Sequence, residues 1–403
     1  MAKLSESDTV DSAGHAMLPY GRQWIDDADI AAVVDVLRGD WLTGGPAVAA
    51  FEAAVAAHVG ARHVVAVSNG TAALHAAAAV AGLGPGDRVA VPAITFLASA
   101  NCARYVGADP VFVDVDPATG LIDLDDLARV AEGGLAAIVP VHLTGRSVDL
   151  DGVAAIAAAT GAVVIEDAAH ALGARYKGAK IGGSGRSAMT TFSFHPVKHA
   201  TTGEGGAIAT DDDALADALM RFRSHGMTKD PALLSVPSPG PWYYEAPTSG
   251  YNYRITDLQC ALGVSQLRRL DGFLSRRRDL VRRYNAALAG FAQIVPNGTG
   301  SAGADGIDDN AWHLYSVRID FAALGTDRGT VMNALAQRGV GTQVHYIPLT
   351  MQPCFKAFVA DPRRYPGAQT YYDRTLSLPL FPAMSEADVD RVVAILVHVL
   401  GLG

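Results

Sequence analysis

Cysteine is scarce in this chain, and so are long apolar runs. The three cysteines among the 403 residues, Cys102, Cys260 and Cys354, lie far apart and show no metal-ligand spacing. This usage predicts a reducing, cytoplasmic environment, without a disulfide framework or a metal site. No apolar run is long enough to span a bilayer, and residues 1–17 are too polar for a signal peptide. We expect those residues to form a disordered leader.

Basic residues are fewer than acidic ones, and the common nucleotide-binding loop motifs are absent from the sequence. The chain has 32 Lys and Arg against 41 Asp and Glu, a formal net charge of −9, which gives no reason to expect nucleic acid or an anionic membrane as a partner. Neither GxGxxG nor a Walker loop fits the strand–helix junctions. Half of the residues are hydrophobic and 18% are charged, as in globular proteins. The length predicts one large and one smaller domain.

Short apolar segments alternate with helical patterns over the first half of the chain. The predicted strands cover residues 63–67, 88–92, 110–114, 136–142, 162–167, 188–194 and 206–210. Seven such strands separated by helices indicate an α/β fold with a mostly parallel, doubly wound sheet. The large domain is expected over residues 18–268 and a small α+β domain over 269–403.

The second half of the chain predicts four further elements. A proline-rich loop is expected over residues 228–250 and a long helix over 256–289. The small domain then fits strands over residues 312–320 and 340–345.

One stretch, AMTTFSFHPVKHATTGEGG at residues 188–206, carries the first chemical signal. Lys198 lies just past the predicted strand end, where open α/β sheets bind ligands, and His195 and His199 flank it. A lone loop lysine is usually a solvated residue. A lysine desolvated between a buried strand and a glycine-rich turn can instead lose its proton and act as a nucleophile or Schiff-base former.

Three further positions complete the set of groups that pyridoxal phosphate needs. The junction at Gly70 and Thr71 is either an ordinary helix cap or an anion site. Asp167 ends a strand, where it can cap the next helix or hold a heterocyclic nitrogen protonated. Phe96 is either a core aromatic or a cover for one ring face. With Lys198, these positions offer a Schiff-base lysine, a partner for the ring nitrogen and a phosphate cup.

A series of motifs in one order makes the signal specific. They read PYGRQWID, DWLTGGP, SNGTAAL, PAITFLASAN, VHLTGRSVD, IEDAAHALGA, FSFHPVKHATTGEGG, GYNYRITDLQ and QVHYIP. From Leu18 to the C-terminus the chain resembles the DegT-type nucleotide-sugar aminotransferases, which are fold type I pyridoxal-phosphate enzymes. The resemblance implies this fold, with a seven-stranded large domain, and pyridoxal 5′-phosphate as the cofactor.

The resemblance also implies a role for each matching residue. Lys198 becomes the catalytic Schiff-base lysine, Asp167 the partner of the ring nitrogen, and His170 a partner of the phenolic oxygen. Phe96 would stack on the ring. The implied phosphate contacts are Gly70, Thr71, Ser193 and, from the partner subunit of a homodimer with shared sites, Asn252.

The expected substrates are glutamate and a nucleotide sugar. PWYYE, GYNYRITDLQCALGVSQL and LSLPLFPAM are most similar to the pseudaminic-acid branch. That branch makes UDP-4-amino-4,6-dideoxy-N-acetyl-β-L-altrosamine from a 4-keto precursor. The candidate substrate contacts are Tyr20, Trp41, Thr43, Trp242, Arg254, His345 and Tyr346. Trp242 suits stacking on a uracil ring and suits loop anchoring equally. Relatives often carry His where this chain has Thr350.

Three other functions stay open. One is an aminotransferase for another UDP- or dTDP-linked keto-sugar. Another is a catalytically silent homologue that binds the cofactor as a regulator, against which the intact Lys198 and Asp167 speak. The third is a pyridoxal-phosphate lyase or decarboxylase on the same large domain. In related dehydratases a His replaces the lysine, so Lys198 argues against that chemistry.

Overall fold

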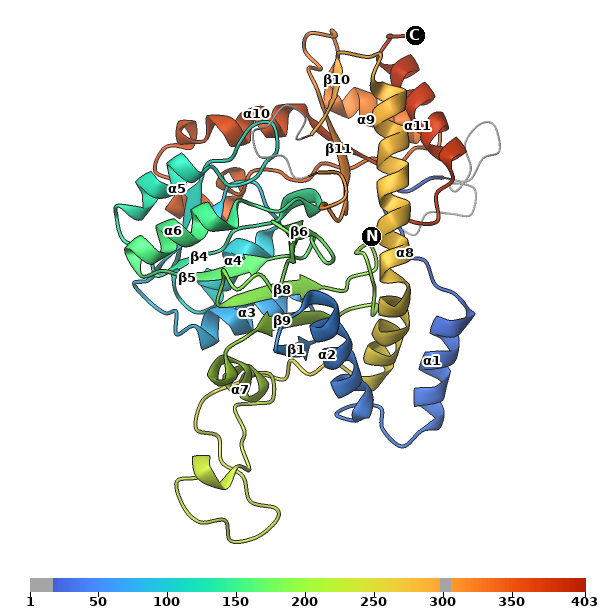
Figure 1. Cartoon of the computed structure of the whole chain (residues 1–403). Helices are drawn as coiled ribbons and strands as arrows, with labels where there is room; N and C mark the ends of the chain where they lie inside the picture. Colours follow the sequence, from blue (N-terminus) through green and yellow to red (C-terminus); the bar gives the residue numbers. More distant parts are fainter. Residues whose placement is uncertain (1–16, 298–305) are drawn as a thin grey trace.

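A seven-stranded sheet forms the centre of the protein (Figure 1). The computed structural model describes residues 17–297 and 306–403, so the predicted leader lies outside the described residues except for Met17. The strands are β1 (His63–Val67), β2 (Arg88–Pro92), β3 (Asp109–Val113), β4 (Ala137–Ile138), β5 (Val163–Asp167), β8 (Met189–Ser193) and β9 (Gly206–Thr210). Their order is β1-β9-β8-β5-β4-β2-β3, and β9 alone runs antiparallel to its neighbours. The predicted mostly parallel sheet is confirmed.

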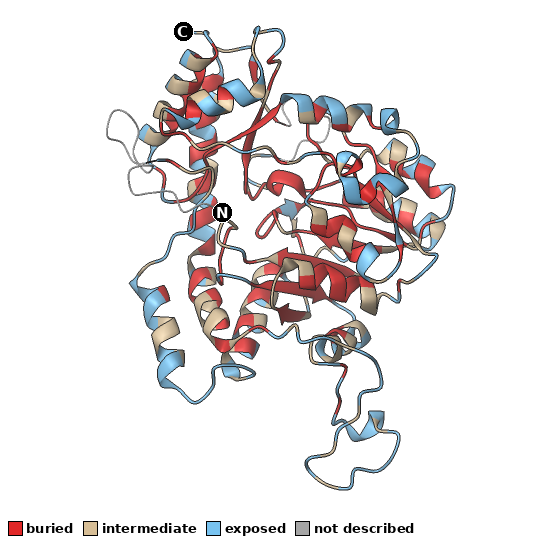
Figure 2. Ribbon diagram, turned by 180° about the vertical axis from the view of Figure 1, so that it is seen from behind, coloured by how far each residue is buried: buried red, intermediate tan, exposed pale blue. Residues whose placement is uncertain are grey.

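Helices cover both faces of this sheet. One face lies under α2 (Pro46–Val59), α5 (Leu124–Ala131) and α6 (Leu150–Thr160), and the other under α3 (Gly70–Val80), α4 (Leu97–Tyr105) and α7 (Asp213–Phe222). Side chains of a strand alternate between the faces, so Val64 and Ala66 enter the first core while Val65 and Val67 enter the second. Both faces are therefore buried, which is why the strands read as continuous apolar runs (Figure 2).

Strand β4 is much shorter than the predicted strand over residues 136–142. Pro140 has no N–H to donate to the ladder. The chain nevertheless stays extended, because Val139 N donates to Ala90 O at 2.8 Å and Val141 forms a bridge with Asp167.

The long helix α8 (Asp257–Leu288) joins the large body to the C-terminal part. Thr256 caps its N-terminus in a capping box with Gln259. Leu270 packs into a core of the large sheet, whereas Leu280 belongs to a third core with the C-terminal elements. The predicted domain boundary after residue 268 lies inside this helix and stays a prediction.

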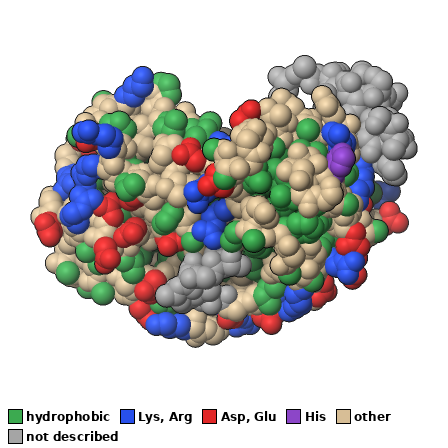
Figure 3. All heavy atoms as spheres, turned by 90° about the horizontal axis from the view of Figure 1, so that it is seen from above, with side chains coloured by type: hydrophobic (Ala, Val, Ile, Leu, Met, Phe, Trp, Pro, Cys, Tyr) green, Lys and Arg blue, Asp and Glu red, His purple; other side chains and the backbone are tan. Residues whose placement is uncertain are grey.

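Basic side chains on the C-terminal half of α8 pair with acids. Arg282 Nη2 lies 2.5 Å from Asp308, and Arg283 Nη2 lies 2.6 Å from Asp390. Basic and acidic side chains are accordingly interspersed on the face that Figure 3 shows. Such exposed pairs add little stability individually, so this face is a mixed-charge surface and not a stabilising network.

The C-terminal part has its own three-stranded antiparallel sheet. Its strands are β10 (Ile294–Pro296), β11 (Tyr315–Ile319) and β12 (Thr375–Leu378), accompanied by α9 (Arg328–Ala336), α10 (Pro366–Arg374) and α11 (Glu386–Val399). The predicted strand over residues 340–345 is wrong. Val340 and Gln343 form only isolated bridges, to Leu18 and Ser377, because the chain then leaves the sheet to line a cavity.

The predicted loop over residues 228–250 projects from the body beyond α7 (Figure 1). Thr228 and Glu245 pair at its base through two backbone hydrogen bonds of 2.8 and 3.1 Å. Within the described ranges, every helix is too short or too polar to cross a membrane.

Candidate active site

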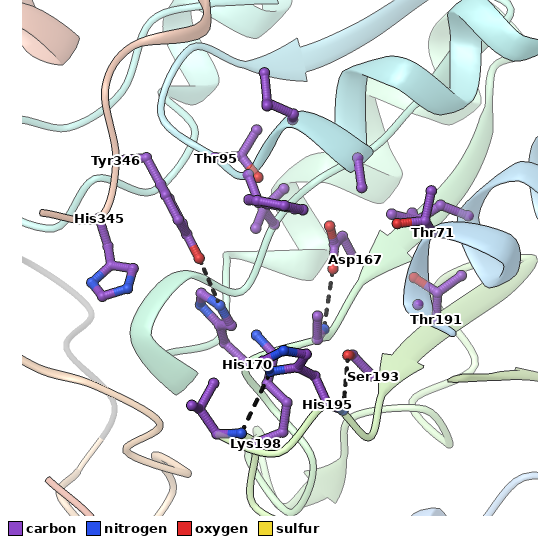
Figure 4. A pocket seen from close by; sticks show the side chains of 18 of the residues that line it. Thr71, Thr95, Asp167, His170, Thr191, Ser193, His195, Lys198, His345 and Tyr346 are labelled. Atoms are coloured by element: carbon purple, nitrogen blue, oxygen red, sulfur yellow. Dashed lines mark hydrogen bonds between the residues drawn. The ribbon is translucent and has the colours of Figure 1, made fainter. Parts of the chain in front are cut away.

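One cavity of about 980 Å³ gathers most of the predicted site residues. It lies where β5 and β8 end and α3 begins (Figure 4). The predicted residues that line it are Tyr20, Gly70, Thr71, Phe96, Asp167, His170, Ser193, Lys198, His345 and Tyr346. This volume lies in the range of cofactor and ligand sites.

The other predicted residues lie outside this cavity in the single subunit. Trp41 and Thr43 belong to a loop held on the start of α8, where Thr43 bridges Thr256. Asn252 bridges Ser224, and Trp242 sits on the projecting loop with 69% of its surface exposed. Arg254 follows Asn252 by two residues. One subunit alone does not bring these side chains to the cavity.

Lys198 lies on a turn that follows β8. Its backbone N–H donates to His195 O at 2.9 Å, and Thr202 N donates to Phe194 O at 3.0 Å to close the turn. Burial lowers the pKa of Lys198 to about 8, and the charge of Asp167 opposes that shift. An amine with this pKa is partly neutral near neutral pH, as a nucleophile or general base must be.

Asp167 ends β5 with its carboxylate toward the cavity (Figure 4). Ser99 Oγ donates to Asp167 Oδ2 at 2.7 Å, and Ala169 N donates to Oδ1 at 3.1 Å. Thr95 Oγ1 lies 2.7 Å from the Ser99 hydroxyl and supports it. The sequence interpretation missed Ser99 and Thr95, because no local pattern marks either hydroxyl as a partner of Asp167.

The neighbouring Glu166 points to the opposite face of the strand and is fully buried. Val148 N donates to Nδ1 of His142 at 3.2 Å, so the proton of the neutral ring is on Nε2, 2.7 Å from Glu166 Oε2. Ser187 Oγ donates to the other carboxylate oxygen at 2.5 Å. Glu166 is thus satisfied inside the protein, and of these two neighbouring carboxylates Asp167 is the one that lines the cavity.

His170 is held from both ring nitrogens. Thr144 N donates to Nδ1 at 3.3 Å, which places the proton of the neutral ring on Nε2, 3.2 Å from Tyr346 Oη. Burial and the nearby Lys198 charge keep the pKa of His170 well below its usual value. His170 therefore presents an N–H donor to the cavity.

In the part of the chain that the structure describes, the start of α3 offers unpaired backbone donors to the cavity. Asn69 caps the helix by accepting from Ala72 N at 2.8 Å. The amides of Gly70 and Thr71 have no hydrogen-bond partner among the described residues. A Cβ at Gly70 would lie 3.0 Å from Ser193 Cβ, so glycine keeps this approach open. Two free amides at a helix N-terminus, with the Thr71 and Ser193 hydroxyls nearby, suit a phosphate.

The cavity offers the groups that a pyridoxal-phosphate transferase requires. Comparison of the chain with known proteins identifies its family. Residues 23–397 match the DegT/DnrJ/EryC1/StrS aminotransferase family. The chain belongs to this family. It is accordingly an aminotransferase, and the predicted fold type I architecture is confirmed by solved structures of sugar aminotransferases.

Known relatives match almost the whole chain. The spore coat polysaccharide biosynthesis protein SpsC of Bacillus subtilis (strain 168) is 43% identical over 378 residues, which cover 93% of this chain and 95% of SpsC. The putative sugar aminotransferase Spr1654 of Streptococcus pneumoniae, in its PMP-form, has a TM-score of 0.87 at 32% identity, covering 95% and 99% of the two chains. Spr1654 is also solved in a PLP-form, in agreement with the predicted cofactor.

A third relative bears on the substrate. Helicobacter pylori PseC, an aminotransferase involved in the biosynthesis of pseudoaminic acid, has a TM-score of 0.87 at 26% identity, covering 96% and 99% of the two chains.

The departure at Thr350 has a structural counterpart. Thr350 is buried in the turn that follows Pro348 and does not line the cavity. Gln352, two residues on, does line it. An uncharged side chain therefore lines the cavity near that position, from a residue that the sequence interpretation did not single out.

Proposed function

We propose that this protein is a pyridoxal-phosphate-dependent aminotransferase of the cytoplasm that acts on a nucleotide sugar. Glutamate is the proposed amino donor, and the acceptor is a UDP-linked 4-keto-6-deoxy-N-acetyl hexose. The product is then UDP-4-amino-4,6-dideoxy-N-acetyl-β-L-altrosamine. The observation that carries the proposal is the meeting of Lys198, Asp167 and the Gly70–Thr71 amides in one cavity.

The cavity fits the cofactor group by group. The amides of Gly70 and Thr71 and the Ser193 hydroxyl would bind its phosphate, and the Asp167 carboxylate would keep a ring nitrogen protonated. His170 Nε2–H would donate to its phenolic oxygen, and Phe96 borders the same space. When bound, pyridoxal phosphate supplies an electron sink for the bonds at the donor's α-carbon.

Lys198 does the proton work in this proposal. Its neutral Nζ would take the proton from the donor's α-carbon as a general base, and the resulting ammonium would give that proton up again as a general acid, so that Nζ returns to its neutral form. The lowered pKa, about 8, keeps this amine available near neutral pH. For the sugar acceptor the same atom acts in the reverse order, so one lysine serves both half-reactions.

The charge balance of the cavity supports shared sites in a homodimer. Glutamate and a nucleoside diphosphate sugar are both anionic, yet Lys198 is the only Lys or Arg among the described residues that line the cavity. Ser68 N donates to Tyr253 O at 2.8 Å, so the segment with Asn252 and Arg254 runs beside the phosphate end of its own cavity. A two-fold axis at that end would bring Asn252 and Arg254 to the partner's site.

SpsC favours a second candidate within the same class. Its higher identity, 43% against 26% for PseC, points to a keto-sugar destined for a surface polysaccharide. A panel of UDP- and dTDP-linked 4-keto-6-deoxy sugars, incubated with protein and glutamate and read by mass spectrometry, separates the two. Amination of the UDP-linked 4-keto-6-deoxy-N-acetyl hexose supports the first proposal, and amination of another UDP- or dTDP-linked keto-sugar in its place overturns that substrate and supports the second.

The same panel tests the remaining functions. Ammonia or CO₂ formed without an aminated sugar would indicate a lyase or decarboxylase. Failure of glutamate to convert the bound cofactor, followed spectroscopically, would indicate a silent homologue.

A further inference from the structure

A buried histidine from the C-terminal part packs on the cofactor-facing His170. The rings of His170 and His313 lie 4.4 Å apart between centroids, at an interplanar angle of 47°. His313 is buried and precedes β11. Its Nδ1 has no hydrogen-bond partner among the described residues, so this nitrogen does not anchor the ring. His313 therefore contacts the site by ring packing, on His170 and, at 5.5 Å between centroids, on His199.

A buried arginine holds the backbone of the segment that carries His313. Nη1 of Arg277, on α8, donates to the carbonyl oxygens of Trp312 and His313 at 3.2 Å each, and to Leu380 O at 3.0 Å. Arg277 is almost fully buried. Burying a guanidinium costs free energy unless its donors are used. Backbone carbonyls of two separate segments accept from Nη1 here, whereas Nε has no hydrogen-bond partner among the described residues.

The same segment is also hydrogen-bonded to His199, which is next to Lys198, and to the chain that holds His170. His199, which follows Lys198, lies with Nε2 3.1 Å from Ala311 O. Ala311 N donates to Gly145 O at 3.0 Å, and Leu314 N donates to Thr144 O at 3.2 Å. Thr144 in turn supplies the amide that fixes His170 Nδ1.

Gly145 allows the backbone of the His313 segment to approach the backbone of His170 closely. Its φ is 101°, and a Cβ there would lie 2.6 Å from Trp312 N and 3.0 Å from His170 O. Only glycine fits such a position without displacing the segment of His313 or the backbone of His170.

We propose that His313 and Arg277 are positioning residues: together they fix the orientation of the His170 ring, so that its Nε2–H faces the cavity. The inference rests on the proposed function and deepens it, since it assigns residues of the C-terminal part to the cofactor site. Arg277 holds the backbone, His313 supplies the face against which His170 packs, and the Thr144 amide selects the tautomer.

The test compares His313→Ala with His313→Phe, in which an aromatic face is retained. With ¹⁵N-labelled histidine, the His170 ring of wild-type apo-protein should show a protonated Nε2 and an unprotonated Nδ1. His313→Ala should give averaged ring signals and a kcat lowered about 10- to 100-fold, as when a catalytic group is misplaced by about 1 Å. His313→Phe should keep both the tautomer and a kcat within about twofold of wild type, because the packing face remains. Arg277→Met should give averaged His170 ring signals and a lowered kcat, as His313→Ala does. His58→Phe on α2 is the matched control.

Unchanged His170 signals in His313→Ala, or equal losses in the Ala and Phe variants, would overturn the proposal. If Arg277→Met does not fold, the two His313 variants decide. The nitrogen signals do not depend on turnover. A wild-type protein without aminotransferase activity would therefore refute the proposed function, while averaged His170 ring signals in His313→Ala would still support the positioning role.

Discussion

Ser99 Oγ donates a 2.7 Å hydrogen bond to Asp167 Oδ2, and both side chains are buried. Ser99 sits in the first turns of α4, whereas Asp167 ends β5 in the middle of the sheet. The bond therefore connects a helix of one face to the strand end that bears the proposed partner of the cofactor's ring nitrogen. It fixes the direction in which Asp167 presents its charge to the cavity.

Replacing Ser99 by Ala should weaken cofactor binding without unfolding the protein. A hydrogen bond to a charged group contributes about 1.5–3 kcal/mol, so the Kd of pyridoxal phosphate should rise about 10- to 100-fold. Absorbance titration of the apo-protein measures this Kd. Ser265→Ala, a buried serine of α8, is the control. Equal Kd values for both variants would show that Ser99 does not orient Asp167.

The reactivity of Lys198 should depend on pH in a defined direction. Burial lowers its pKa to about 8, so the neutral amine is scarce below that pH and predominates above it. The rate at which apo-protein captures pyridoxal phosphate, trapped with borohydride, should rise through pH about 8 and level off. Peptide mapping should place the adduct on Lys198, and Lys198→Ala should form none.

Asp167→Asn extends this test. The Asp167 carboxylate stabilises the ammonium form and raises the pKa of Lys198. Removing that charge should therefore move the midpoint of the rate profile to lower pH. A midpoint near the ordinary lysine pKa of about 10.4, or one that moves upward in Asp167→Asn, would contradict the arrangement described here.

Much of the site is predictable because strand ends are predictable. Lys198 and Asp167 each follow an apolar run, and parallel strands bring such ends to one edge. Gly70 and Thr71 are likewise marked by a strand–helix junction. These signals are local in sequence, and the family resemblance assigned their roles.

What escaped prediction depends on contacts between distant segments. Ser99 meets Asp167 across 68 positions, and Arg277 meets Leu380 across 103. No periodicity in either segment indicates such a partner. The strand expected over residues 340–345 was also wrong for a long-range reason. Gln343, Val344 and His345 line the cavity, so the segment forms only isolated bridges.

Mixing two inactive variants should test whether the sites are shared. Lys198→Ala lacks the catalytic amine, and Asn252→Ala lacks the proposed phosphate contact from the partner. A heterodimer of the two would contain one site with both residues intact, so activity should recover to at most about half of wild type per dimer. Refolded mixtures over a range of ratios provide the measurement. Activity that never exceeds that of the separate variants would mean that Asn252 serves its own subunit.

Replacing Trp242 tests whether its side chain binds the base of the nucleotide sugar. It projects from the loop over residues 228–250 with 69% of its surface exposed, and the loop lies outside its own cavity. An indole so exposed in the single subunit is available to stack on a uracil ring in a partner's site, a contact that contributes about 1–3 kcal/mol per base. Trp242→Ala should therefore raise KM for the UDP-sugar about 5- to 100-fold and leave KM for glutamate within about twofold, with kcat little changed. Val236→Ala, an exposed apolar residue of the same loop, should alter neither KM. Equal increases for both substrates would assign Trp242 to anchoring of the loop, and unchanged values would remove it from the site.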